Sequence, residues 1–414
     1  MSAVIEKVIA RKVFNSRGEE TIEVEILTRV SFGRASAPSG ASRGKAEVAP
    51  YPKGGVDEAV KIVNQLIAPK LVGMNADDQT GIDSLLHSLD QTEDFRKIGG
   101  NTAFAISLAV AEAAANSYEM PLFQYLGGCL ANELPYPLGN VLGGGKHTLG
   151  KSPDIQEYLA LPVGALTFLD AANANVLTHQ KVGRLLKDRE KAFNGGRNDE
   201  GAWTCTLTNE EAVEVVAEAC EEASNELGFT VRAGLDVAAS TLWNPKKERY
   251  IYPRAEKEMD TGEQLDFILD LIKTYKLAYV EDPFHEEDFE SFAELTKKAK
   301  DCLICGDDLF VTNKKRLEHG IKAKAANSII IKVNQVGTLS DAWQTTQTAR
   351  KFRYIPVLSH RSGDTADNHI AHLAVAFHSP IIKTGVVGGV RIAKLNELIR
   401  IEEMLGNQAK MAKL

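Results

Sequence analysis

The chain has 414 residues, of which 44% are hydrophobic and 25% charged, values that are ordinary for a globular protein with a buried core. This length exceeds one ordinary compact domain and suits two domains, or one large barrel with an added domain. The formal net charge of −8 argues against nucleic acid or an anionic membrane as a partner, and it fits an enzyme that holds an anionic substrate through local charges and metals.

The chain carries no sign of export or of a membrane span. No basic segment followed by an apolar stretch opens it, so we expect no signal peptide, and no apolar run approaches the roughly 20 residues that a span requires. A cytoplasmic location is the resulting expectation. The five cysteines are odd in number and scattered, unlike a disulfide framework. Cys302 and Cys305 have CxxC spacing, but nothing completes a zinc set, so we interpret both as apolar filling around a buried strand.

The first quarter of the chain predicts strands followed by helices. Residues 4–13 and 21–30 have strand-like composition, with a turn at 16–18. Helical patterns follow at 56–67, 81–89 and 102–116, and Asn101 is the expected N-cap of the last helix. Glycine and two prolines in residues 127–137 mark a boundary. We therefore expect an N-terminal α+β capping domain over residues 1–133 and a second domain over residues 134–414.

The second domain repeats a unit of strand and helix. A helix beginning at Thr208, with Glu211 completing a capping box and Gly228 ending it, precedes a strand that ends at Asp236. A helix beginning at Thr261 precedes a strand that ends at Glu281. Further short apolar strands are expected at 303–307, 328–332, 356–360 and 381–383. Such repeats, with parallel strands, predict either a doubly wound sheet or a β/α barrel.

Polar side chains at the ends of these strands favour the barrel. Each of six expected strands ends in one: Asp236, Glu281, Asp307, Lys332, His360 and Lys383. A barrel brings such groups together at one mouth, where its catalytic residues lie. The sequence therefore predicts an α/β fold with a C-terminal TIM-like β/α barrel.

Three of these side chains, those of Asp236, Glu281 and Asp307, are carboxylates that repel one another unless a cation lies among them. A hard divalent cation such as Mg²⁺ takes oxygen ligands of this kind. The alternative is three unrelated acids, each capping a helix. Lys332 follows three isoleucines and so leaves a buried strand, where burial and nearby cations would lower its pKa and make it a base. The alternative for Lys332 and Lys383 is that both extend outward and only pair with the acids.

Three loops carry further candidates. His360, Arg361 and Ser362 are consecutive, a combination that suits a phosphate. The glycine-rich run before His147 fails the test for a nucleotide-binding P-loop, because Asn140 and His147 stand where glycine and serine or threonine are required, and a flexible substrate loop is the better interpretation. Glu157 and Glu200 are expected in loops, where a pair of acids opposite a lysine base could protonate a leaving hydroxyl.

Taken together, these segments resemble the enolase family of phosphopyruvate hydratases over nearly the whole chain. The matching motifs occur in the family's order, at residues 15–18, 38–42, 156–157, 199–201, 235–236, 281–284, 307–308, 332–335, 359–363 and 383–385. The resemblance implies an enolase-type barrel and the reversible dehydration of 2-phospho-D-glycerate to phosphoenolpyruvate, a step of glycolysis and gluconeogenesis. It also implies two Mg²⁺ ions in each active site and a homodimer or higher homo-oligomer.

The same resemblance implies a role for each site residue. Lys332 would remove the C2 proton, and Lys383 would help to stabilise the dianion that forms. Glu200, with Glu157, would assist departure of the C3 hydroxyl. The metal ligands would be Asp236, Glu281 and Asp307 for the first ion and Ser39 for the second. Arg361 and Ser362 would hold the phosphate, His147 and His360 would line the pocket, and Glu23 and Arg400 match positions that pair across the family's dimer interface.

The chain departs from the family pattern in its loops. Arg43 replaces a threonine, residues 146–150 alter the histidine loop and include the bulky Leu149, Ala202 replaces a glycine, and residues 386–390 are one residue shorter than usual. These departures leave open a paralogue that acts on another phosphorylated or phosphonate acid. A binding protein that kept the fold without catalysis is the remaining alternative, against which the intact Glu157, Glu200 and Lys332 argue.

Overall fold

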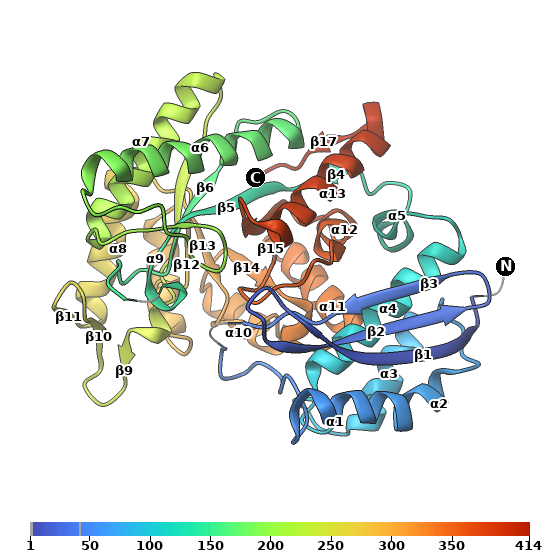
Figure 1. The fold of residues 1–414 in the computed structure, drawn as a ribbon. Coiled ribbons are helices and arrows are strands. Elements are labelled where there is room, and N and C mark those ends of the chain that lie inside the picture. Colours follow the sequence, from blue (N-terminus) through green and yellow to red (C-terminus); the bar gives the residue numbers. More distant parts are fainter. Residues whose placement is uncertain (1–2, 41–42, 149) are drawn as a thin grey trace.

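The computed structural model describes residues 3–40, 43–148 and 150–414. Leu149 of the altered histidine loop and the last two residues of the 38–42 motif lie outside the described residues. A smaller α+β domain, coloured blue to cyan in Figure 1, packs beside a barrel ringed by helices. None of the helices in the described ranges combines the length and the apolar character needed to cross a membrane.

The N-terminal domain is an antiparallel sheet covered by helices. Its strands β1 (Ile5–Phe14), β2 (Glu20–Thr28) and β3 (Phe32–Ser36) are joined in that order. The helices are α1 (Gly55–Ile62), α2 (Ala68–Leu71), α3 (Gln79–Asp90), α4 (Gly100–Ser117) and α5 (Leu122–Gly127), with a π-helical turn over Val63–Ile67 between α1 and α2. A side chain at Gly33 would begin 2.2 Å from the Ala109 carbonyl oxygen, so glycine there lets the sheet approach α4 closely.

The prediction of an N-cap at Asn101 is wrong. The N-cap of α4 is Gly99, and Asn101 lies inside the first turn of the helix. Its side-chain oxygen accepts a hydrogen bond from Asn334 Nδ2 at 3.1 Å. This amide joins the N-terminal domain to the barrel instead of capping its own helix, a partner that local sequence does not reveal.

Eight strands close the barrel, and one of them runs against the others. The strands are β5 (Tyr136–Gly143), β6 (Glu157–Leu161), β8 (Arg232–Asp236), β12 (Tyr279–Glu281), β13 (Leu303–Gly306), β14 (Ser328–Ile331), β15 (Ile355–Ser359) and β16 (Ile381–Gly385), and β16 pairs with β5 to complete the ring. β6 is antiparallel to both of its neighbours, and Glu157, its first residue, pairs with Asp236, the last residue of β8. The expectation of parallel strands throughout, with Glu157 in a loop, is therefore corrected.

Eight helices surround the barrel in the described part of the chain (Figure 1). They are α6 (Phe168–Arg189), α7 (Asn209–Leu227), α8 (Thr261–Tyr275), α9 (Phe289–Lys298), α10 (Lys314–Ala323), α11 (Leu339–Lys351), α12 (His369–Ala376) and α13 (Gly389–Leu405). The capping box of Thr208 and Glu211 and the left-handed Gly228 are confirmed for α7. The predicted start of a helix at Thr261 is confirmed for α8, whose capping box is formed by Asp260 and Glu263, and a carboxylate at the N-cap also favours the positive end of the helix.

Short strands complete the fold. β9 (Trp243–Asn244), β10 (Arg249–Tyr252) and β11 (Lys257–Met259) form a small sheet beside the barrel. β7 (Trp203–Thr204) pairs beside β5. β4 (Glu133–Leu134) pairs with β17 (Lys410–Met411), so the C-terminal end of the chain returns to the segment that leads into the barrel.

Two of the five cysteines, Cys302 and Cys305, behave as apolar filling. All five are free, and Cys302 and Cys305 are buried. Burial raises the pKa of Cys302 to about 12 and that of Cys305 well above its usual value. Neither thiol is prepared to ionise, which confirms their interpretation as filling around the buried strand β13.

Candidate active site

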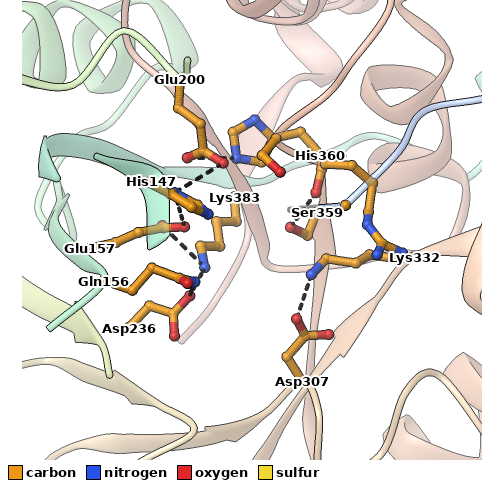
Figure 2. A pocket seen from close by; sticks show the side chains of 13 residues that line it. His147, Gln156, Glu157, Glu200, Asp236, Asp307, Lys332, Ser359, His360 and Lys383 are labelled. Carbon is orange, nitrogen blue, oxygen red and sulfur yellow. Dashed lines mark hydrogen bonds and ion pairs between the residues drawn. The ribbon is translucent and has the colours of Figure 1, made fainter. Parts of the chain in front are cut away.

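A polar cavity of about 30 Å³ lies at the mouth of the barrel, where the carboxyl ends of the parallel strands meet (Figure 2). Ten residues that line it are labelled in Figure 2: His147, Gln156, Glu157, Glu200, Asp236, Asp307, Lys332, Ser359, His360 and Lys383. Gly40, Arg361 and Ser362 complete the lining. Most of the residues that the sequence selected are therefore brought to one place by strands far apart in the chain.

One side of the cavity consists of strand-end carboxylates around the ammonium group of Lys383. Its Nζ donates to Asp236 Oδ2 at 2.9 Å and to Glu281 Oε2 at 2.8 Å, and it lies 3.2 Å from Glu157 Oε2. Burial alone would lower the pKa of Lys383, but the three carboxylates hold it well above the usual value. Burial, and then the Asp236 carboxylate, raise the pKa of Glu281 to about 7.

Lys332 is in direct contact with Asp307 (Figure 2). Its Nζ donates to Asp307 Oδ2 at 2.5 Å, and Gln335 Nε2 donates to Asp307 Oδ1 at 2.9 Å. Burial lowers the pKa of Lys332, but the carboxylates of Asp307 and Glu281 together outweigh it, so the pKa is raised. The expectation of a lowered pKa is therefore wrong for the protein without metal, because the nearest charge is an acid and not a cation.

The carboxylates at the strand ends fit a divalent cation. Glu281 Oε1 is fully buried and has no hydrogen-bond partner, a costly state for a carboxylate oxygen. A cation among Asp236, Glu281 and Asp307 would satisfy this atom with oxygen ligands alone, the donor set that Mg²⁺ prefers.

A second group of acids consists of Asp282, Asp307 and Asp308, each with a carboxylate oxygen within 4.8 Å of the others. In this group, Asp282 binds backbone groups. Its two carboxylate oxygens accept the backbone N–H groups of Asp307, at 3.0 Å, and of Asp308, at 2.8 Å. Asp282 therefore fixes the turn after β13 that aims Asp307 into the cavity, and its oxygens are already used.

The other side of the cavity pairs two glutamates with imidazole rings. His147 Nδ1 lies 3.6 Å from both Glu157 Oε1 and Glu200 Oε1, and Asn140 Nδ2 donates to Glu200 Oε2 at 2.9 Å. Burial and the Glu200 carboxylate raise the pKa of Glu157 well above normal. Burial also disfavours ionised Glu200, but His360 and His147 outweigh it and hold its pKa well below normal. The pair can thus hold one proton on Glu157 and keep Glu200 ionised.

His360 lies against Glu200, with its Nε2 atom 3.5 Å from Glu200 Oε2. Burial lowers the pKa of His360 to about 4, so the ring is neutral at pH 7 and acts on Glu200 as an N–H donor. On its other edge, Nδ1 lies 2.8 Å from Arg391 Nη1. The permanent charge beside this ring therefore belongs to Arg391, a residue of α13.

The predicted phosphate-binding residues lie in the loop after β15. Arg361 Nη1 donates to Glu47 Oε2 at 3.0 Å and to Asn334 Oδ1 at 3.3 Å. Ser362 lines the cavity, and its carbonyl oxygen accepts from Ser16 Oγ at 3.3 Å. The N-terminal domain, through Glu47 and Ser16, therefore holds this loop from one side.

Ser39 is not brought into the lining of the cavity. Its Oγ donates to Glu19 Oε2 and accepts from Asn15 Nδ2, both at 2.9 Å, and its backbone pairs with Gly363 at 2.7 and 2.8 Å. The adjoining Gly40 does line the cavity. The predicted part of Ser39 in binding a second metal stays a prediction.

Several residues of the site were not selected from the sequence for a role, among them Gln156, Asn140, Asp282 and Arg391. Gln156 Nε2 lies 3.4 Å from Asp236 Oδ2, and Asn140, Asp282 and Arg391 hold other site residues in place. Gln156 could have been found because it precedes Glu157 in a family motif. The other three act through partners that lie at least 25 positions away in the chain, so no local pattern marks them.

Comparisons with known proteins cover almost all of the chain. Residues 131–413 match the model of an enolase C-terminal TIM barrel domain, and residues 5–126 match that of an enolase N-terminal domain. The enolase of Methanosphaera stadtmanae is 53% identical over 98% of this chain and 99% of its own length. The enolase of Methanothermobacter thermautotrophicus is 52% identical over 97% of both chains, and that of Pyrobaculum aerophilum is 48% identical over 98% of this chain and 97% of its own length.

Proposed function

The chain belongs to the enolase family, and from this premise we propose how the cavity at the barrel mouth works as its active site. The protein is a lyase that dehydrates 2-phospho-D-glycerate to phosphoenolpyruvate in glycolysis, and the family implies a divalent metal and a phosphorylated acid as substrate. The observation that carries the proposal is the meeting of Lys332, Glu200 and the carboxylates of Asp236 and Asp307 in one buried cavity.

The proton at C2 of the substrate is removed by Lys332. The lysine must be neutral to accept it, and the Asp307 carboxylate at 2.5 Å opposes this. Engagement of Asp307 as a metal ligand would remove that opposition. Lys383, held among three carboxylates, keeps a positive charge where the substrate carboxylate gains its second negative charge.

Glu200 and Glu157 carry out the second half of the reaction. Loss of the C3 hydroxyl as water requires a proton, and the protonated Glu157 and the ionised Glu200 share one between them. His147 lies 3.6 Å from both carboxylates and can keep them in register. Arg361 and Ser362 would hold the phosphate, for which the guanidinium fork is suited.

We propose Mg²⁺ as the metal, with two ions in each active site. The first would be held by Asp236, Glu281 and Asp307, and the buried Glu281 Oε1 atom, which lacks a hydrogen-bond partner, favours a hard cation there. The second would involve Ser39. When bound, these ions supply positive charge that stabilises the dianion formed after proton loss.

The described residues of the altered loops, His147 excepted, do not line the cavity. Arg43 Nη2 donates to the Val48 carbonyl at 2.9 Å, and Ala202 is buried with its N–H on Asn198. Arg43 and Ala202 do not line the cavity, and neither do residues 386–390. Of the described residues in 146–150, His147 alone lines it. This supports 2-phospho-D-glycerate over another phosphorylated or phosphonate acid.

A direct assay tests the reaction. The purified protein is given 2-phospho-D-glycerate with Mg²⁺, and phosphoenolpyruvate is measured by its absorbance or by a coupled assay. Steady turnover is expected. A folded, metal-loaded protein that does not turn over this substrate would defeat the proposal, and assays with other phosphorylated or phosphonate acids would then follow.

Three further proposals concern the whole chain. We propose a division into domains at residues 1–133 and 134–414, close to the gap between the two family matches, which end at residue 126 and begin at residue 131. We propose a homodimer or higher oligomer that uses Glu23 and Arg400. Within one chain Arg11 donates to Glu23 at 2.6 Å and Arg400 to Glu397 at 2.8 Å, so both have local partners as well. A cytoplasmic location is proposed from the glycolytic role.

A further inference from the structure

A buried arginine on α13 contacts both of the loops that carry chemistry at the mouth. Arg391 is 1% exposed. Its Nη1 donates to the Arg361 carbonyl at 2.7 Å, and its Nη2 donates to the Ser362 carbonyl at 2.5 Å and to the Asp199 carbonyl at 3.3 Å. One guanidinium therefore ties the loop of Arg361 and Ser362 to the loop of Glu200.

The same guanidinium determines where His360 carries its proton. Nη1 lies 2.8 Å from His360 Nδ1, and a guanidinium can only donate. Nδ1 must then accept, so the ring proton lies on Nε2, the atom 3.5 Å from Glu200 Oε2. Exchange of the two ring positions would leave a lone pair facing the Glu200 carboxylate and an N–H group facing the guanidinium, two repulsive contacts in place of two attractive ones.

The surrounding chain leaves this arginine little freedom. A side chain at Gly385 would begin 2.3 Å from the Glu200 carbonyl oxygen and 2.9 Å from Arg391 Cγ, so the strand, the acid loop and the arginine pack without spare room. The nearest carboxylate, Asp364 Oδ2, is 3.4 Å from Nη1 and lies closer to Lys394 Nζ, at 3.2 Å. A simple ion pair with Asp364 therefore does not explain an arginine directed at three carbonyls and a ring nitrogen.

We propose that Arg391 is a positioning residue for the dehydration, which fixes the Nε2–H form of His360 toward Glu200 and holds the two loops in register. Arg391 does not reach the cavity itself; it acts through His360 and through the backbone of Arg361, Ser362 and Asp199. This role rests on the proposed function, but the state of the His360 ring can be measured without turnover.

The first test reads the ring directly. Histidine labelled with ¹⁵N is introduced, and the His360 signals are identified by their loss in His360→Asn. Long-range ¹H–¹⁵N spectra at pH 7 are expected to show Nε2 protonated and Nδ1 as acceptor in the unchanged protein, and a mixture of forms in Arg391→Met. A ring protonated at Nδ1 in the unchanged protein overturns the proposal, whatever the activity, whereas an inactive protein with the expected ring state would count only against the proposed reaction.

The second test separates positioning from general stability. Arg391→Ala is expected to lower kcat by about 10- to 100-fold, with a smaller change in KM, and guanidinium chloride at about 10 mM should restore part of the loss where sodium chloride of equal ionic strength does not. Lys394→Met is the matched control, since it removes a buried cation from the same helix that donates to the Thr365 carbonyl and pairs with Asp364, but does not donate to His360 or to the carbonyls of Arg361, Ser362 and Asp199. A loss in Lys394→Met equal to that in Arg391→Ala, or no response to guanidinium, would contradict the role. If Arg391→Ala does not fold, Arg391→Lys takes its place. A kcat of Arg391→Lys within threefold of the kcat of the unchanged protein would also contradict the role.

Discussion

The two sides of the cavity neutralise their carboxylates in different ways. On the strand-end side, Asp236, Glu281 and Asp307 face the ammonium groups of Lys332 and Lys383 at 2.5–2.9 Å. On the loop side, Glu200 faces an amide and two imidazoles, of which His360 is neutral at pH 7. A full charge beside a carboxylate can be exchanged for a metal, whereas a neutral donor leaves the acid free to give and take protons. The first arrangement suits metal binding and carbanion stabilisation, and the second suits departure of water.

Loss of the base should have the largest effect. Lys332→Ala is expected to lower turnover by about 10²- to 10⁴-fold, because Lys383, the other lysine that lines the cavity, is held protonated by three carboxylates. It should also stop exchange of that proton with deuterated solvent, as measured by NMR of the recovered 2-phospho-D-glycerate. Lys315→Ala, at an 87% exposed side chain, is the control that should keep full activity. Undiminished turnover in Lys332→Ala would show that Lys332 is not the base that removes the C2 proton.

Loss of the acid side should divide the reaction in two. Glu200→Gln is expected to slow phosphoenolpyruvate formation by about 10²- to 10⁴-fold while C2 proton exchange continues, since Lys332 and its carboxylate partners are untouched. The ratio of exchange to product formation is the measurement. If exchange and product formation fall together, the two sides do not act on separate steps and the comparison fails.

Metal should stabilise the protein only through the strand-end side. Saturating Mg²⁺ is expected to add roughly 3–4 kcal/mol to the free energy of unfolding, seen as a higher Tm that EDTA reverses. Glu281→Gln should lose most of this gain, because the amide cannot replace the buried carboxylate oxygen that lacks a partner. Glu200→Gln is the matched variant and should respond to Mg²⁺ as the unchanged protein does. An equal loss in both would place the metal elsewhere.

The smallest effect concerns a histidine whose surroundings are opposite to those of His360. Burial lowers the pKa of His369, but Asp367 and Glu112 outweigh it and raise the pKa to about 9. Because the folded pKa lies above the unfolded value of about 6.5, its stabilisation is complete below that value and is lost as the pH rises through 9. Urea unfolding should show the difference in stability between the unchanged protein and His369→Gln shrinking by about 2–3 kcal/mol between pH 6 and pH 10. A constant difference would show that His369 is neutral, as His360 is.

The strand-end side could be predicted from the sequence because each of its residues follows an apolar run, and parallel strands bring such ends together. Asp236, Asp307, Lys332 and Lys383 line the cavity, and Glu281 adjoins it through its hydrogen bond from Lys383. Lys383 lies inside β16, which continues to Gly385, and not at the end of the strand. The resemblance to a known family supplied the roles, which the strand pattern alone could not.

The loop side of the cavity could be predicted less well from the sequence, for physical reasons. Nothing in residues 157–161 reveals that β6 runs antiparallel, so Glu157 was expected in a loop. Arg391, Asn140 and Asp282 act on partners that only the folded barrel brings near. The prediction that the pKa of Lys332 is lowered is wrong for a related reason, since the direction of the shift depends on whether an acid or a metal lies nearest to the ammonium group.

The reversed strand has a consequence for how this active site can change. β5 and β6 form a hairpin whose connecting segment, residues 144–156, begins and ends at the mouth, whereas most of the other barrel strands are linked through helices that cross the outside of the barrel. Exchanges in this segment therefore need not move a helix of the surrounding ring. His147 lies in this segment and Glu157 directly after it, so the one connection that is free of the helical ring is also the one that borders the acid pair. Substrate selectivity could be altered here without displacing that ring.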